Sequence, residues 1–132
     1  MYRKNLFCRK KKEDRSAREL VKKIESYIDK YYTDDNINVF AVANEFGFSR
    51  EYISRLFKKY TNTTILDTIH NKRMMLAQKL LADGQNVNNV AYQVGYTNVN
   101  VFIRRFKQYT KMTPKEYATK CASAANSNVE EK

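Results

Sequence analysis

The sequence of 132 residues is poor in the side chains that enzymes use for catalysis and metal binding. It has one histidine, His70, two cysteines, Cys8 and Cys121, and only three glycines. One histidine leaves no Ser/His/Asp set, and three separated glycines form no glycine-rich phosphate loop. The two cysteines lie towards the two ends without a CxxC spacing, so free, reduced thiols are expected. We therefore predict that the chain is not an enzyme and holds no metal or cofactor.

Long apolar runs and a signal peptide are also absent, so a soluble cytoplasmic chain is expected. What the sequence does have is positive charge. Lysine and arginine number 25 against 14 acidic residues, which gives a formal net charge of +11. Such an excess favours a polyanionic partner, nucleic acid first, although charge can also serve solubility alone.

An internal repeat is the most informative feature of the chain. Residues 42–49 match residues 90–97 at a shift of 48, and residues 53–58 match residues 102–107 at a shift of 49. One extra residue therefore lies in the second copy, just after its turn. Each copy predicts a short helix, a glycine-centred turn, a hydroxyl N-cap and a second helix carrying Arg and Lys. This is the pattern of a helix-turn-helix, whose second helix enters the DNA major groove.

Helical periodicity and cap residues predict how the chain is divided. Thr64 and Gly84 mark the ends of a long connecting helix, while Asn86 or Asn88 starts the second short helix. Within the connecting helix Arg73 interrupts the apolar stripe, so an internal hydrogen-bonded or ionic contact is expected for it. The predicted parts are a basic linker (1–15), a first helix-turn-helix subdomain (16–63), the connecting helix (64–83), a second subdomain (84–122) and a disordered tail (123–132).

Several motifs resemble the DNA-binding domain of the AraC/XylS family of bacterial transcription regulators over residues 21–118. They are Arg73-x3-Ala77-x2-Leu80-Leu81, Val90-Ala91-x2-Val94-Gly95-Tyr96, Phe102-x-Arg104-x-Phe106-Lys107 and Met112-Thr113-Pro114-x2-Tyr117. The resemblance implies an all-α domain of seven helices, with two subdomains joined by a long helix. It also implies two recognition helices in successive major grooves on one face of double-stranded DNA.

The resemblance further implies an activator that meets RNA polymerase, and a sensor or receiver domain N-terminal to this one in the full-length protein. The chain departs from the family at four positions. Asn62 and Lys111 stand where the family commonly has glycine, and Lys111 is expected to be strained if its φ is positive. Asn98 replaces an acidic residue, and Ile103 replaces a small polar one.

The outward faces of the two recognition helices supply the predicted DNA contacts. Arginine matches guanine O6 and N7, asparagine can pair with adenine, and an isoleucine favours thymine methyl groups. Simpler roles remain open: a solvated helix face for the charged residues, a helix cap for Asn98 and core packing for Ile103. The predicted base readers are Arg50, Glu51, Ser54, Arg55, Asn98, Asn100, Ile103 and Arg104. The predicted phosphate contacts are Lys58, Lys59, Lys107, Lys111 and the helix starts at Asn38 and Asn88.

These features favour a sequence-specific, double-stranded DNA-binding transcription regulator acting at the nucleoid. The alternative is a helical protein–protein interaction module with a basic surface. The two readings differ over Arg55 and Arg104, which occupy equivalent outward positions and which an interaction module has no reason to duplicate. RNA binding is less favoured, because no sheet with an aromatic stacking platform is predicted.

Overall fold

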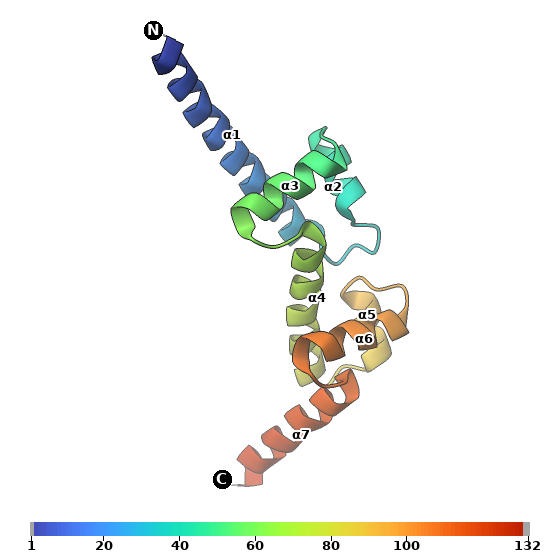
Figure 1. Ribbon diagram of the computed structural model, residues 1–132. Coiled ribbons are helices and arrows are strands. Elements are labelled where there is room, and N and C mark those ends of the chain that lie inside the picture. The colour runs from blue at the N-terminus through green and yellow to red at the C-terminus, as the bar shows by residue number, and fades with distance from the viewer. Residues whose placement is uncertain (1, 131–132) are drawn as a thin grey trace. The chain divides into compact units, whose positions relative to one another are not determined.

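A computed structural model describes the backbone of residues 2–130 and the side chains of residues 14–124. Every regular element in this part of the chain is an α-helix, which confirms the predicted all-α class (Figure 1). No helix in it is long and apolar enough to cross a membrane. The helices are α1 (Tyr2–Tyr31), α2 (Val39–Phe46), α3 (Arg50–Thr61), α4 (Ile65–Ala82), α5 (Val87–Gln93), α6 (Val99–Thr110) and α7 (Pro114–Glu130).

The chain forms two compact units. Unit 1 contains the chain up to Tyr31 together with Asn38–Thr68, and unit 2 contains Tyr32–Ile37 together with the chain from Ile69 onward. Each unit therefore holds one helix-turn-helix, α2–α3 in unit 1 and α5–α6 in unit 2. Helix α4 contributes its first turn to unit 1 and the rest of its length to unit 2.

The core of unit 1 is built from one face of each of its helices. The buried positions in α1 and α3 recur three or four residues apart, as expected for helices that bury a single stripe. Helix α1 contacts α3, and α3 contacts α2. The buried core residues of unit 1 are Val21, Ile24, Ile28, Val42, Ala43, Ile53, Leu56, Phe57 and Ile65.

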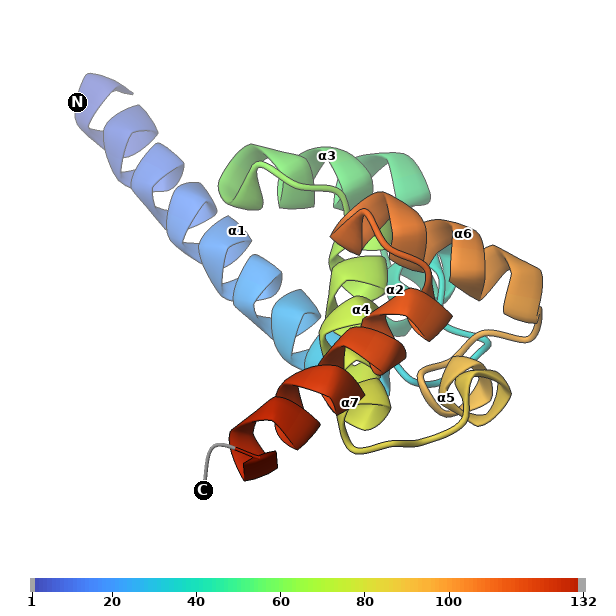
Figure 2. The ribbon, with the colours of Figure 1, turned by 90° about the horizontal axis from the view of Figure 1, so that it is seen from below.

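The core of unit 2 is richer in aromatic rings. Phe102 and Phe106 of α6 are fully buried, with ring centroids 5.8 Å apart, and Phe106 meets Tyr117 of α7 edge-on at 5.5 Å. Figure 2 shows α6 and α7 from a second side, joined by a short turn. The remaining buried members of this core are Met74, Ala77, Leu81, Val90, Ala91, Val94 and Tyr96.

The two terminal helices are longer than the sequence pattern predicts. Helix α1 begins at Tyr2, where a linker through residue 15 was expected, and α7 continues to Glu130, where a tail from residue 123 was expected. Periodicity reveals only helices that bury an apolar stripe, whereas a helix without such a stripe can still form from residues of good intrinsic propensity. Residues 2–15 contain neither glycine nor proline and are rich in Lys and Arg.

Candidate nucleic-acid interface

The two helix-turn-helix copies share the same turn. In unit 1 the Phe48 N–H donates to the Ala43 carbonyl at 3.0 Å, and in unit 2 the Tyr96 N–H donates to the Ala91 carbonyl at 2.9 Å. Gly47 and Gly95 both adopt positive φ, 75° and 113°, a region that glycine enters without steric cost. The turns predicted from the sequence are confirmed.

The recognition helices α3 and α6 also begin alike. Each has 12 residues and an N-cap side chain that accepts a main-chain hydrogen bond: Ser49 from the Tyr52 N–H, and Asn98 from the N–H groups of Asn100 and Val101. These bonds satisfy amides that have no partner within the helix. The hydroxyl N-cap predicted for the second copy, which would be Thr97, is therefore wrong: the extra residue after the turn places Asn98 at the start of α6.

The ends of α3 and α6 match as well. The hydroxyl of Thr61 donates to the Phe57 and Thr63 carbonyls, and that of Thr110 donates to the Phe106 and Met112 carbonyls. The residue after each helix is left-handed, with φ of 61° at Asn62 and 68° at Lys111. Lys111 thus meets the condition under which strain is expected, because a lysine is less suited to positive φ than asparagine or glycine.

Replacing Lys111 with glycine is expected to stabilise the fold by about 1 kcal/mol, because glycine enters the left-handed region freely. If Lys111 contacts a phosphate, the same variant binds DNA more weakly. Thermal unfolding and DNA titration of Lys111→Gly measure the two effects. Asn62→Gly is the matched control, since asparagine already tolerates this conformation and Asn62 has no charge to lose. Equal stability changes at the two positions would contradict the assignment of strain to Lys111.

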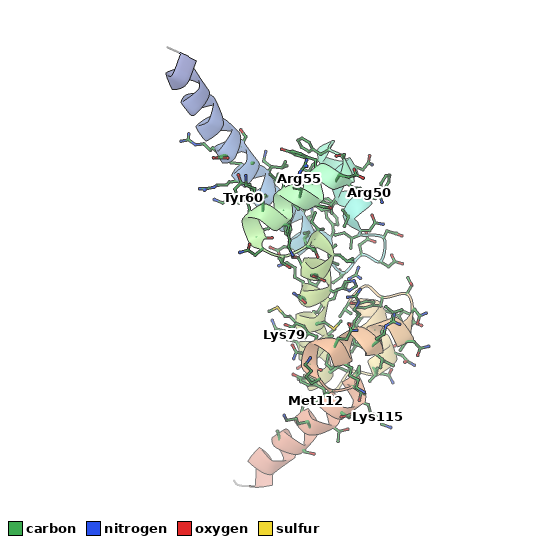
Figure 3. All side chains as sticks on the ribbon, viewed as in Figure 1. Arg50, Arg55, Tyr60, Lys79, Met112 and Lys115 are labelled. Carbon is green, nitrogen blue, oxygen red and sulfur yellow. The ribbon has the colours of Figure 1, made fainter. Side chains whose placement is uncertain are left out.

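The outward face of α3 is as predicted. Arg50, Glu51, Ser54 and Arg55 are all exposed, as are Lys58 and Lys59 in the last turn, while the opposite side packs in the core. In Figure 3 the labelled Arg50, Arg55 and Tyr60 follow one another along this helix. The Tyr60 hydroxyl donates to Asp14 of α1 at 3.4 Å, which ties the end of α3 to α1 within unit 1.

The outward face of α6 is less uniform. Asn98, Asn100, Arg104, Lys107 and Lys111 are exposed. Asn98 also uses its side-chain oxygen to cap the helix.

Ile103 differs from the other predicted base readers. It is half-buried and packs against the core of unit 2, which accounts for its apolar side chain without DNA. A contact between Ile103 and a base remains a prediction. Because Ile103 packs on this core, Ile103→Ser is expected to lower the melting temperature.

The N-caps of α2 and α5 show which groups are available at the helix starts where phosphate contacts were predicted. Asn38 caps α2 and accepts the Ala41 N–H at 2.7 Å. In α5 the cap is Asn86, and it accepts the Asn88 N–H at 2.8 Å. Of the two caps considered for this helix, Asn86 is correct. The main-chain N–H of Asn88 already donates to the Asn86 side chain, so it is not free to donate to a phosphate as predicted.

Arg73 makes the internal contacts predicted for it. Only 5% of this side chain is exposed. Its Nε donates to the Tyr32 carbonyl at 2.6 Å and its Nη2 to the Asp34 carbonyl at 3.0 Å, which attaches the loop between α1 and α2 to unit 2. The guanidinium carbon lies 5.0 Å from the centre of the Tyr96 ring. Burial lowers the pKa of Arg73, and the nearby Tyr96, Asp35 and Asp34 partly offset this.

Tyr96 connects Arg73 to the turn of the second helix-turn-helix. Burial raises the pKa of its phenol, and the neighbouring Arg73 opposes that shift. The Tyr96 hydroxyl hydrogen-bonds with His70 Nδ1, and the two rings stack with centroids 5.6 Å apart. His70 is therefore half-buried and hydrogen-bonded within unit 2.

Metal-ligating side chains do not gather in the described part of the chain, where no three His, Cys, Asp or Glu residues are placed to hold an ion. Cys121 is a free, half-buried thiol, and the side chain of Cys8 lies outside the described residues. One surface feature was not predicted: Phe48 and Tyr52 form a stacked aromatic pair at the start of α3. Two aromatic residues on either side of the Ser49 cap were the available signal.

Comparison with known proteins supports the helix-turn-helix assignment. Residues 42–120 match the family model of a helix-turn-helix domain. The chain is 41% identical over 91 residues to an uncharacterized HTH-type transcriptional regulator in the cgkA 5' region of Pseudoalteromonas carrageenovora, covering 69% of this chain and 54% of the relative. The chain thus spans about half the length of that relative.

Two solved structures have a similar fold. One is the C-terminal domain of the two-component response regulator yesN from Fusobacterium nucleatum, with a TM-score of 0.71 and 34% identity over 78% of this chain and 98% of that domain. The other is the DNA-binding domain of AdpA in complex with a target DNA, with a TM-score of 0.73 and 19% identity over 79% and 94% of the two chains. At that identity the second likeness concerns the fold alone.

Proposed function

The chain belongs to the AraC/XylS family of DNA-binding helix-turn-helix transcription regulators, and we propose that it reads two successive major grooves of one DNA site and activates transcription there. One observation carries the two-groove proposal: α3 and α6 repeat each other from cap to cap and present Arg55 and Arg104 at equivalent exposed positions. A chain with two such helices needs no second copy to read two boxes.

Within this proposal the exposed residues have two kinds of role. Arg55 and Arg104 read guanine through their planar forks, assisted in α3 by Arg50, Glu51 and Ser54. In α6 the residues Asn98, Asn100 and Ile103 border the groove that this second recognition helix enters. The lysines at the helix ends, Lys58, Lys59, Lys107 and Lys111, neutralise phosphates and set the register without reading sequence.

The larger organisation is proposed on the same basis. Residues 16–63 and 84–122 act as the two reading subdomains, and residues 64–83 join them. An activator bound in this way would meet RNA polymerase at the promoter, on the chromosome in the cytoplasm.

Selection of bound sites from a random duplex library tests the proposed function. We expect an asymmetric site of roughly 16–20 bp containing two boxes about 10–11 bp apart, one for each recognition helix. Arg55→Ala is expected to relax preference at one or two base pairs of one box, and Arg104→Ala at one or two base pairs of the other. Each is expected to cost about 1–3 kcal/mol of specific binding.

Lys79→Ala provides the matched control. Lys79 is exposed on α4, away from both recognition helices in sequence, and its replacement also removes one positive charge. This variant is expected to select the same motif as the unmodified chain. A palindromic site that requires two chains, or unchanged motifs for both arginine variants, would refute the two-groove proposal.

A further inference from the structure

An aromatic pair lies exposed at the start of the first recognition helix. Phe48, in the turn before the Ser49 cap, remains 43% exposed, and its ring stacks on that of Tyr52 with centroids 5.1 Å apart and an interplanar angle of 29°. A stacked pair of this kind holds both rings in one orientation. The apolar surface of Phe48 is thus presented beside the cap of α3.

The equivalent position in the second helix-turn-helix is buried. Tyr96 is the counterpart of Phe48 in the repeat and is only 5% exposed, because His70 and Arg73 pack on it. The position after the turn glycine is therefore a core position in unit 2 and a surface position in unit 1. Core packing explains the aromatic residue in unit 2, whereas most of the explanation for Phe48 must come from its partner Tyr52 or from a molecule outside the chain.

The Tyr52 hydroxyl is available for such a molecule. Among the described residues it has no hydrogen-bond partner, unlike the hydroxyl of Tyr60 on the same helix, which donates to Asp14, and that of Tyr96, which bonds with His70. Tyr52 is one helical turn from the exposed Arg55, and Arg50 begins the same helix. Arg55, three residues after Tyr52, lies on the same side of α3, and its positive charge favours a negatively charged acceptor for the phenol.

We propose that the Phe48–Tyr52 pair binds the DNA backbone at the edge of the groove that α3 enters. The Tyr52 hydroxyl donates a hydrogen bond to a phosphate oxygen, and the exposed Phe48 ring packs against the neighbouring deoxyribose. The pair adds affinity and fixes the register of α3 without reading bases, as backbone contacts do. This inference rests on the proposed function of α3 and assigns two residues that the recognition-face pattern does not include.

Tyr52→Phe separates a DNA contact from simple packing, because it keeps the ring and its stack while removing the hydroxyl. We expect DNA affinity to fall about tenfold, the magnitude of one hydrogen bond to a charged group, with an unchanged melting temperature. The selected motif and the salt slope should also be unchanged, because neither a base contact nor a charge is lost. Phe48→Leu, which retains an apolar side chain but no ring, is expected to weaken binding in the same direction.

Tyr92→Phe is the matched control, since Tyr92 lies on α5, is 58% exposed and loses the same hydroxyl outside the recognition helices. It is expected to bind like the unmodified chain. If the unmodified chain selects a motif and Tyr52→Phe binds it equally well, the backbone contact is wrong and the pair only packs the start of α3. If the unmodified chain selects no motif, the proposed function itself fails.

Discussion

Replacing Gly95 with alanine is expected to destabilise the protein by about 3 kcal/mol and to lower its melting temperature by about 10 °C. Two costs combine at this position. The φ of Gly95 is 113°, a conformation that L side chains rarely adopt. A Cβ would also lie 2.9 Å from Nε of Arg73, whose guanidinium is held by the Tyr32 and Asp34 carbonyls and by the Tyr96 ring. Since Arg73 cannot move without losing these contacts, the clash is not relieved cheaply.

Gly47 offers the matched control. It occupies the equivalent turn in unit 1 with φ of 75°, and a Cβ there meets nothing within 4 Å. Gly47→Ala therefore costs only the backbone strain, about 1 kcal/mol. Thermal unfolding of both variants measures the difference, and equal melting temperatures would show that Arg73 yields freely.

The coupling to Arg73 can be measured directly. Arg73→Ala is itself expected to destabilise the fold, because it removes the donor of two part-buried hydrogen bonds. In the Arg73→Ala background, however, Gly95→Ala should cost less than in the unmodified chain, because the clashing guanidinium is gone and only the backbone strain remains. A cost for Gly95→Ala that stays the same in both backgrounds would place the destabilisation in the backbone alone.

DNA affinity is expected to fall by about three to five orders of magnitude between 50 and 200 mM monovalent salt. The chain has a net charge of +11, and exposed lysines lie at the ends of both recognition helices. Neutralising about six to ten phosphates releases the counterions bound to them, which gives a log–log salt slope of about −5 to −9. Titration of one specific duplex at four or more salt concentrations measures this slope.

The basic N-terminal segment contributes part of this positive charge, and its share of DNA binding can be tested by deletion. Six of the 25 basic residues lie within residues 2–12: Arg3, Lys4, Arg9, Lys10, Lys11 and Lys12. A chain lacking residues 2–12 keeps Asp14, which bonds with Tyr60 of α3. We expect it to bind the same motif more weakly. A slope shallower than about −3 for the intact chain would mean that much of its charge is remote from DNA.

The turns, caps and helix ends could be predicted from the sequence because they depend on local interactions. The two glycine turns, the Ser49 cap and the left-handed Asn62 after α3 depend on hydrogen bonds within a few residues, so residue type and spacing predict them. The repeat at shifts of 48 and 49 extends the same reasoning to a second copy. Arg73 was assigned an internal contact because a charged residue inside an apolar stripe must find partners when it is buried.

The partners of these residues were decided only by the tertiary structure. The sequence indicates that Arg73 is internal, but the chain's path brings it to the Tyr32 and Asp34 carbonyls, about forty residues away. Packing likewise made Ile103 an edge of the core, and it buried Tyr96 while leaving its repeat counterpart Phe48 exposed. A helical wheel places a residue on a face of its own helix, but whether another helix or loop covers that face depends on contacts distant in sequence. Local pattern therefore determined which helices form and where they turn, and long-range packing decided which of their aromatic and apolar side chains remain available to a partner.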